Sequence, residues 1–312
     1  MKKLDVIGFG ALNVDKLYNV NKITHEDEET FITDFNEYCG GSAANTIIGL
    51  SKLGIKTGFI GKIAEDHEGN LLLKNLQQEG VNTDGIIITP DGRSGNVLGF
   101  VDNEGQRALY VDPGVNDLIK YREIGIEYIN NSRVLHLTSF VGGSFKAQEE
   151  VLKEINDDVM VSIDPGRIYA ERGIKFIKNI LNRTDVILIN EEELKHLTEN
   201  KYENCVQGAE FLLKLGINHV IIKRGDKGSY ITDGNESYYI PPFEVKCIDT
   251  TGAGDAFNAG FLYGLLKNKD IEESAKLGNF TASCCITEYG AIKGLPNTNQ
   301  LNNLNKYHLH KV

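Results

Sequence analysis

Residues 249–262 read Asp-Thr-Thr-Gly-Ala-Gly-Asp-Ala-Phe-Asn-Ala-Gly-Phe-Leu, a glycine-rich turn that runs directly into a helical pattern. The small and apolar residues that follow the turn recur at helical spacing, at Ala256, Phe257, Gly260, Phe261 and Leu265. The turn Gly252-Ala253-Gly254 therefore lies where a helix begins, and N–H groups there lack intrahelical partners. Such a place binds anions, phosphates above all, and Asp255 beside it can accept a proton from a hydroxyl group. The stretch favours phosphoryl transfer to an alcohol, although an acidic helix cap after a glycine turn would look the same.

The composition limits the class of protein. The chain has 312 residues, 41% hydrophobic and 25% charged, which is enough for one large α/β domain with a sizeable core. Its formal net charge is −11 and no basic patch is visible, so we expect no nucleic-acid partner. No apolar run approaches the roughly 20 residues that span a bilayer, and residues 1–8 resemble a first strand more than a signal peptide. Five cysteines without a Cys-x-x-Cys pair fit reduced thiols, and together these features predict a cytoplasmic protein.

Apolar strand patterns alternate with amphipathic helical patterns along the chain. Runs rich in Val, Ile and Leu predict buried strands at 6–12, 58–63, 134–137, 160–163, 186–189 and 220–222. Helical spacing lies between them, at 43–53, 69–79, 145–156, 174–181, 205–215, 256–267 and 271–288. This alternation predicts a mostly parallel sheet covered by helices on both faces.

Two segments, at about 14–38 and 92–112, depart from that alternation. The first has apolar residues at near-alternate positions around the acidic turn 26–29. The second has two strand patterns, 95–101 and 107–111, joined by Asp-Asn-Glu-Gly, which is a hairpin signal. We expect both segments to leave the main sheet and pair as a small β-lid on a single domain that spans 1–312.

Polar residues follow the first strand and precede the first helix. Asn13 and Asp15 lie at the carboxyl end of a strand, where open α/β sheets bind ligands, and they suit the vicinal hydroxyls of a sugar. An ordinary Asx turn would explain them equally well. In Gly40-Gly41-Ser42-Ala43-Ala44-Asn45, the glycines let backbone approach a ligand and Asn45 offers a donor and an acceptor, although tight helix–sheet packing selects the same residues.

Two more polar clusters follow later strands. Residues 190–193, Asn-Glu-Glu-Glu, can hold Mg²⁺ through water, but an Asn cap on an acidic first helical turn is the favoured explanation. Residues 223–228, Lys-Arg-Gly-Asp-Lys-Gly, fit a polyphosphate or an ordinary surface hairpin. The segment Gly8-Phe9-Gly10 begins like the dinucleotide-binding motif Gly-x-Gly-x-x-Gly, but Asn13 occupies the position of the third glycine. A hydride-transferring enzyme is therefore disfavoured.

In their order along the chain, these motifs resemble the ribokinase family, also called the PfkB carbohydrate kinase family. Asn13-Val14-Asp15, Cys39–Asn45, Asn190 with Glu193, and Asp249–Asp255 carry the resemblance, which spans about 6–296. It implies a doubly wound, ribokinase-like α/β domain with a small β-sheet lid that often forms a dimer clasp. It implies transfer of the γ-phosphoryl of ATP, with Mg²⁺, to a hydroxymethyl group of a sugar or sugar-like molecule.

The resemblance also implies roles for individual residues. Asp255 would be the catalytic base, and the amides of Gly252, Ala253 and Gly254 would form an anion hole. The acceptor would be bound by Asn13, Asp15, Gly40, Gly41 and Asn45. Nucleotide phosphates and Mg²⁺ would lie near Asn190, Glu193, Lys223, Gly225 and Gly228, with Asn279 near the adenine. Asp249 and the backbone of Thr251 would hold a monovalent cation such as K⁺.

Some features leave the acceptor open. Residues 136–140, His-Leu-Thr-Ser-Phe, lack the acid that often touches the sugar in ribokinase-like members, so strict ribose specificity is not expected. Arg167 can meet an anionic group of the substrate or pair with a surface acid. Nucleoside kinases share the same signatures, and an apolar pocket with aromatic lid residues would favour them. A binding protein without catalysis is disfavoured by the intact Asp255, whose pKa we expect helix-end amides to lower.

Overall fold

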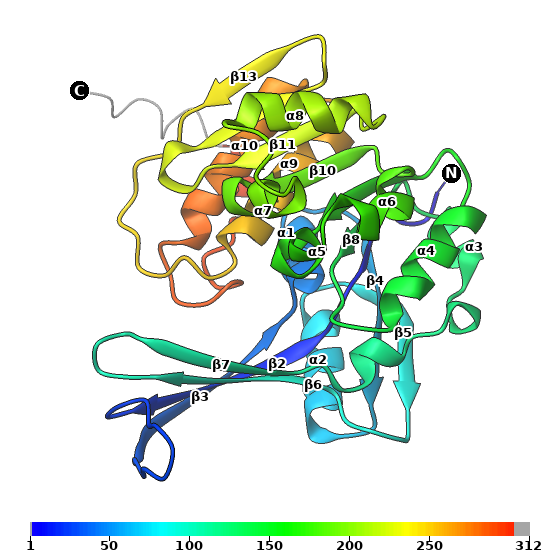
Figure 1. Ribbon diagram of the computed structural model, residues 1–312. Coiled ribbons are helices and arrows are strands. Elements are labelled where there is room, and N and C mark those ends of the chain that lie inside the picture. Colours follow the sequence, from blue (N-terminus) through cyan, green and yellow to red (C-terminus); the bar gives the residue numbers. More distant parts are fainter. Residues whose placement is uncertain (1, 303–312) are drawn as a thin grey trace.

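The computed structural model describes residues 2–302, and its core is a nine-stranded sheet (Figure 1). The strand order is β13-β12-β11-β10-β9-β8-β1-β4-β5. The strands are β1 (Val6–Phe9), β4 (Thr57–Ala64), β5 (Asn82–Thr89), β8 (Val134–Thr138), β9 (Met160–Asp164), β10 (Val186–Asn190), β11 (His219–Lys223), β12 (Ser229–Thr232) and β13 (Ser237–Ile240). All pairs from β5 to β11 are parallel, and only β12 and β13 at one edge are antiparallel. The predicted mostly parallel α/β fold is confirmed.

Helices cover both faces of this sheet because its strands are apolar on both sides. The helices are α1 (Ser42–Lys52), α2 (His67–Gln78), α3 (Ile126–Asn130), α4 (Ser144–Glu154), α5 (Gly166–Arg172), α6 (Ile174–Leu181), α7 (Glu191–Leu197), α8 (Cys205–Lys214), α9 (Ala253–Leu266), α10 (Ile271–Cys285) and α11 (Thr298–Asn302), with short 3₁₀ turns η1 (Gly114–Leu118), η2 (Tyr121–Glu123) and η3 (Gly225–Lys227). In β10, Ile187 and Ile189 join the core under α4–α8, whereas Val186 and Leu188 pack with α9 and α10. This period of two explains why the strand reads as an unbroken apolar run.

A second, four-stranded sheet forms the lid, with the order β3-β2-β6-β7. Its strands are β2 (Asn13–Val20), β3 (Ile32–Gly40), β6 (Gly95–Val101) and β7 (Arg107–Asp112), and Figure 1 shows them extending away from the main body. They fall within the two segments expected to leave the main sheet, extended by one residue at Asn13 and two at Gly40. The lid strands therefore run directly into the polar motifs around residues 13 and 40.

The two faces of the lid differ in chemistry. Tyr38, Asp15, Val97 and Val111 form one row across the four strands, so their side chains share a face. The opposite face carries a row of ring contacts from Phe35 through Tyr18 and Phe100 to Tyr110, with ring centroids 4.9–6.1 Å apart. One face is thus mixed in polarity and the other is aromatic.

Several elements have no counterpart in the sequence-based expectation. The strand expected over 6–12 ends at Phe9, because residues 10–12 connect it to the lid. Strands β5, β12 and β13 and the short helix α5 were not expected. Within residues 2–302, no helix combines the length and the apolar character needed to cross a lipid bilayer.

Candidate active site

The first turn of α9 carries Asp255 and a set of free backbone donors. Gly252 caps the helix with φ of 75°, and a Cβ there would lie 2.4 Å from the Ala291 Cβ, so glycine is required. The Ala253 N–H donates to the Thr250 carbonyl at 3.2 Å. Across residues 2–302, the N–H groups of Gly252, Gly254 and Asp255 have no backbone partner. The donors open to an anion are therefore these three, and Ala253 is already engaged.

Asp255 is 9% exposed and is held by the first turn of α1. Ser42 Oγ donates to its Oδ1 at 2.8 Å, and Asn45 Nδ2 donates to its Oδ2 at 2.8 Å. Burial raises the pKa of Asp255 to about 6, while the hydrogen bonds from Asn45 and Ser42 act in the opposite direction. The expectation that helix-end amides lower this pKa was wrong, because the loss of solvent dominates. The carboxyl is still mostly ionised at neutral pH and is a stronger base than an exposed aspartate.

Some of the residues predicted to bind the acceptor line a cavity, and the others contact residues beside it. Asn13 and Gly41 line a cavity of about 210 Å³ between the main sheet and the lid. It is also lined by Ser42, Val97, Val111, Asn116, Asp117, Thr138, Ser139, Phe140 and Ile168. Asn45 instead binds Asp255, and its buried Oδ1 has no partner among residues 2–302. Gly40 lies against Asp15, where a Cβ would come within 2.4 Å of the carboxylate Oδ2.

Asn116, in η1, was missed by sequence reasoning although it lines the smaller cavity and holds the segment that carries Asn13. Its Oδ1 accepts from the Leu12 N–H at 2.9 Å, and its Nδ2 donates to the Leu12 carbonyl at 2.8 Å and to Asn13 Oδ1 at 3.0 Å. Asn116 is buried, so these bonds clamp the strand end that carries Asn13. The available signal was a polar Asn-Asp pair directly after the second lid segment.

Lys223, at the end of β11, is buried in a network that lies beside the α9 turn. Its Nζ contacts Asp164 Oδ2 at 2.6 Å and Asn258 Oδ1 at 3.3 Å, and Asn258 Nδ2 donates to the same Asp164 oxygen at 2.7 Å. Burial disfavours both charges, but their attraction outweighs it, so the pKa of Lys223 is raised and that of Asp164 lowered. A Cβ placed on Gly254 would lie 3.4 Å from the Lys223 Nζ. The ammonium therefore adds positive charge to the donors of the α9 turn.

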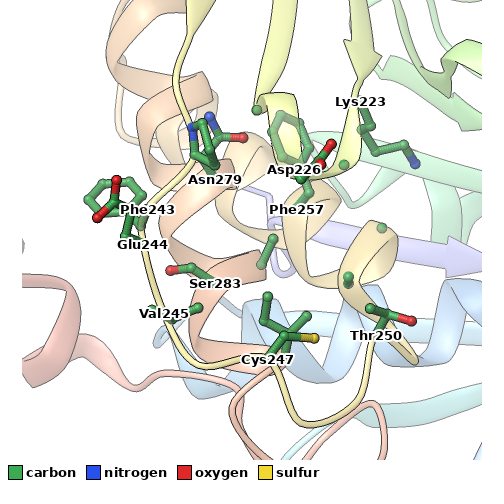
Figure 2. A pocket seen from close by; sticks show the side chains of 17 residues that line it. Lys223, Asp226, Phe243, Glu244, Val245, Cys247, Thr250, Phe257, Asn279 and Ser283 are labelled. Carbon is green, nitrogen blue, oxygen red and sulfur yellow. The ribbon is translucent and has the colours of Figure 1, made fainter.

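A larger cleft of about 520 Å³ opens on the other side of that turn. Lys223 and Asp226 lie at one end, and Figure 2 shows the segment that carries Phe243, Val245 and Cys247 along the opposite wall. Gly225, Gly228 and Asn279, all predicted to meet the nucleotide, line this cleft. Gly228 has φ of 78°, and a Cβ there would lie 2.0 Å from the Ile240 carbonyl oxygen. Both requirements select glycine at this position.

Asn279, on α10, lines the larger cleft and also anchors one of its walls. Its Nδ2 donates to the carbonyl oxygens of Ile240 at 3.1 Å and Pro241 at 2.9 Å. The side chain therefore anchors the segment that forms one wall of the cleft. Its amide hydrogens are used by the protein, which leaves its carbonyl oxygen as the group able to accept from a ligand.

Asn190 and Glu193 cap the N-terminus of α7, which is the explanation that the sequence favoured for this acidic cluster. Asn190 Oδ1 accepts from the Glu193 N–H at 2.7 Å, and Glu193 Oε2 accepts from the Asn190 N–H at 3.0 Å. Burial raises the pKa of Glu193 to about 7, with Asp164 acting in the same direction and Lys223 against it. Within residues 2–302, no group of three or more His, Cys, Asp or Glu side chains is arranged to hold a metal ion.

Two further predicted residues are engaged by the protein itself. Asp249 accepts hydrogen bonds from the Thr251 N–H at 3.0 Å, the Thr251 hydroxyl at 2.7 Å and the Gly290 N–H at 2.9 Å. Arg167 has a side chain that is 70% exposed and pairs with Glu171 at 2.6 Å. The surface ion pair is therefore the alternative that the structure shows for Arg167.

Known proteins of similar sequence include carbohydrate kinases. A sequence model described as the pfkB family of carbohydrate kinases matches residues 3–298. The chain belongs to this family. It is 46% identical over 253 residues to an uncharacterized sugar kinase of Archaeoglobus fulgidus, covering 80% of this chain and 98% of that protein. It is 32% identical to an ATP-dependent ribose-1-phosphate kinase of Halopiger xanaduensis, covering 92% and 93% of the two chains.

Solved structures agree with this assignment. The ribokinase of Thermotoga maritima superimposes with a TM-score of 0.86 at 29% identity, covering 97% of this chain and 99% of that one. A nucleoside kinase of Methanocaldococcus jannaschii superimposes with a TM-score of 0.85 at 24% identity, covering 98% and 100%, which shows the shared fold. The protein is a carbohydrate kinase with the ribokinase-like fold, as the resemblance implied.

Proposed function

We propose that this pfkB-family enzyme transfers the γ-phosphoryl of ATP to a hydroxymethyl group of a sugar or sugar-like molecule. One observation carries the proposal. Asp255 is buried at the junction of the two cavities, since its partner Ser42 lines the smaller cavity while its neighbour Gly254 lines the larger cleft. A base at this junction can meet an acceptor hydroxyl on one side and a terminal phosphate on the other.

The reaction follows from that placement. The acceptor oxygen attacks the γ-phosphorus while its proton passes to the Asp255 carboxylate. The bond from the γ-phosphorus to the bridging oxygen breaks, and its electron pair leaves with ADP. Because such transition states are loose, positioning and charge stabilisation matter more than the strength of the base. The free N–H groups of the α9 turn and the Lys223 ammonium stabilise the charge on the migrating group.

The larger cleft fits a nucleotide in shape and charge. The apolar walls formed by Pro242, Phe243, Val245, Phe257 and Ile286 suit a base, and the cationic end with Lys223 suits the phosphates. Mg²⁺, when bound with the nucleotide, supplies charge neutralisation at the phosphate oxygens. Glu193 would hold it through water, since Mg²⁺ keeps much of its hydration when bound.

A sugar acceptor is favoured over a nucleoside by the lid. The lid residues that line the smaller cavity besides Asn13 are Val97 and Val111, which are aliphatic. The aromatic row of Tyr18, Phe35, Phe100 and Tyr110 lies on the opposite face, where it cannot stack on a base in this cavity. Among residues 2–302, no aromatic side chain of the lid lines this cavity, and Tyr38 is the aromatic residue that shares the lid face of Val97 and Val111.

The same aromatic row supports a homodimer formed through the lid. Phe35 is 46% and Tyr110 62% exposed, and Phe31, just before β3, is 80% exposed. An apolar surface of this kind is typical of a protein interface. We expect a dimer in analytical ultracentrifugation and a monomer after Phe35→Glu, whereas a wild-type monomer at micromolar concentration would contradict this assembly.

A monovalent cation such as K⁺ would be held by the Asp249 carboxylate and the backbone of Thr251. The donor set of one carboxylate and nearby carbonyl groups suits a weakly held alkali cation better than a divalent one. We expect replacement of K⁺ by choline to lower turnover and Asp249→Asn to abolish the difference. Equal turnover of the wild type in both salts would exclude this site.

The proposed function is tested by acceptor-dependent ADP release from the wild-type enzyme with ATP and Mg²⁺, using pentoses, hexoses, sugar acids and nucleosides. Phosphorus NMR of the product identifies the ester. We expect a primary phosphate ester of at least one sugar. ADP release without any acceptor ester, or with nucleosides alone, would contradict the proposal.

A further inference from the structure

We infer that the acceptor of this enzyme is an uncharged polyhydroxylated molecule, and that sugars bearing a phosphate or a carboxylate are poor substrates. The inference rests on the proposed function and specifies its substrate class. It depends on the charges that surround the smaller cavity. Among residues 2–302, the lining of that cavity includes one carboxylate, amides and hydroxyls, and no cation.

Asp117 is the only charged side chain that lines the cavity, as far as residues 2–302 are concerned. Its Oδ1 accepts from the Gly142 N–H at 2.8 Å, which fixes the carboxylate at the wall. The other polar lining groups are the amides of Asn13 and Asn116 and the hydroxyls of Thr138 and Ser139. These groups match the hydroxyls of a neutral sugar, and none of them can neutralise an anion.

Two further carboxylates border the same space. Asp15 lies in one row with Val97 and Val111, the lid residues that line the cavity, so its side chain is on the inner lid face. Nothing within residues 2–302 donates a hydrogen bond to it, and burial raises the pKa of Asp15 to about 6. Asp255 is the third acid, bonded to the cavity residue Ser42. All three groups can accept a hydrogen bond from a hydroxyl, and their negative charge repels an anion.

Within residues 2–302, the cations around the cavity lie outside its lining. Lys223 lines the larger cleft and pairs with Asp164 at 2.6 Å, and Arg167 pairs with Glu171 at 2.6 Å while largely exposed. Arg107 is on the same lid face as Val111 but does not line the cavity, and its charge acts on Asp249. Arg172 donates to the Val141 carbonyl and lies over the Phe176 ring at 4.7 Å. Lys16, on the other face of the lid, pairs with Glu68 on α2. An anionic acceptor would therefore enter a negative cavity whose lining, as far as residues 2–302 are concerned, supplies no counter-charge.

The expected size of this effect follows from Coulomb's law. Two like charges about 5 Å apart at an effective dielectric constant of about 20 repel strongly enough to weaken binding by about 100-fold. One carboxylate at the wall is sufficient for a discrimination of that order. The Halopiger xanaduensis relative is named for a phosphorylated sugar, so this property would separate the two proteins within one family.

The test uses matched acceptor pairs that differ by one anionic group: ribose with ribose-1-phosphate, and glucitol with gluconate. With ATP and Mg²⁺ and the full-length enzyme, we expect kcat/KM for the neutral member of a pair to be at least about 100-fold higher. Higher kcat/KM for the charged member of either pair would overturn the inference while leaving the kinase function intact. Failure of every acceptor would instead count against the proposed function.

The variant Asp117→Asn assigns the discrimination to the cavity wall. Asparagine keeps an oxygen that can accept from the Gly142 N–H, so the fold should be retained, and circular dichroism checks this. We expect the ratio of neutral to anionic kcat/KM to fall by about 100-fold, the effect of one carboxylate about 5 Å from the anion. The matched control Asp157→Asn removes an exposed charge in the loop after α4 and should leave the ratio unchanged. An equal ratio in wild type and Asp117→Asn would overturn the role of this carboxylate.

Discussion

The two cavities that meet at Asp255 are built on opposite principles. The larger cleft, proposed for the nucleotide, has apolar walls, a buried ammonium and free N–H donors, and the groups at its phosphate end come from short contiguous motifs at residues 223–228 and 249–255. The acceptor cavity is negative and is assembled from the lid, η1 and the ends of β1 and β8. Under the proposed function, the donor substrate would be recognised by local backbone features, and the acceptor by side chains that only the tertiary fold brings together.

Asp255→Asn removes the proposed base between the two cavities and should have the largest effect on activity. We expect kcat to fall by at least about 1,000-fold, because the hydroxyl proton loses its acceptor, while the KM for nucleotide and for acceptor changes less than about 5-fold. Steady-state kinetics measure both constants, with Asp157→Asn as the control for loss of a carboxylate. Turnover within 10-fold of the wild type would show that Asp255 is not the base.

Lys223→Met should weaken the nucleotide side alone. We expect kcat/KM for ATP to fall by about 100-fold, because the ammonium beside the α9 turn is lost. The variant also leaves Asp164 buried and unpaired, which should lower the free energy of unfolding by roughly 3–5 kcal/mol. Urea unfolding measures this.

The double variant Lys223→Met with Asp164→Asn provides the control for that stability loss. It should recover much of the free energy of unfolding without recovering activity, since the buried charge is removed but the cation is not restored. Full activity of either variant would contradict the role of Lys223 in stabilising the phosphoryl group.

Asn116→Ala should affect the acceptor side alone. The Leu12 N–H and carbonyl lose their partners, so we expect the free energy of unfolding to fall by about 1–3 kcal/mol and the acceptor KM to rise by about 10-fold. The KM for ATP should stay within 2-fold of the wild type, which isothermal titration with a nucleotide analogue can confirm. A parallel loss of ATP affinity would show that the two cavities are not independent.

The pH dependence of kcat/KM gives the smallest but most specific effect. Because burial raises the pKa of Asp255 to about 6 and the base must be ionised, activity should fall as the pH drops through about 6. The Asn45 hydrogen bond lowers that pKa, so Asn45→Ala should move the acid limb to higher pH. A wild-type limb below pH 5, or no movement in Asn45→Ala, would place the titrating group elsewhere.

Sequence reasoning succeeded where structure is set locally. The alternation of apolar runs and helical spacing gave the parallel sheet, and the hairpin at 95–111 gave part of the lid, because the period of side-chain burial follows directly from strand and helix geometry. The α9 turn could be located because its glycines are required by φ of Gly252 and by close contacts. The short strands β12 and β13 were missed, since tyrosines, serines and a threonine interrupt their apolar pattern, although β12 is buried and only β13 lies at the partly exposed edge.

The acceptor site could not be worked out in the same way. Asn116 and Leu12 are 104 residues apart in the chain, and nothing in either segment indicates that they bond. The pairing of Asp164 with Lys223 and the contact of Ser42 with Asp255 likewise depend on the sheet order. The pKa of Asp255 was expected to fall and instead rises, because burial of the carboxylate cannot be inferred from the residues beside it.

The most direct measurement is a crystal structure of Asp255→Asn with ATP, Mg²⁺ and a sugar that the wild-type enzyme phosphorylates. The variant should bind all three without transferring the phosphoryl group. We predict a sugar hydroxyl about 3 Å from the side chain of residue 255 and in line with the γ-phosphorus. The oxygens of the γ-phosphate should accept hydrogen bonds from the N–H groups of the α9 turn. A sugar bound outside the cavity lined by Asn13 and Asp117, or a γ-phosphate remote from that turn, would contradict this prediction.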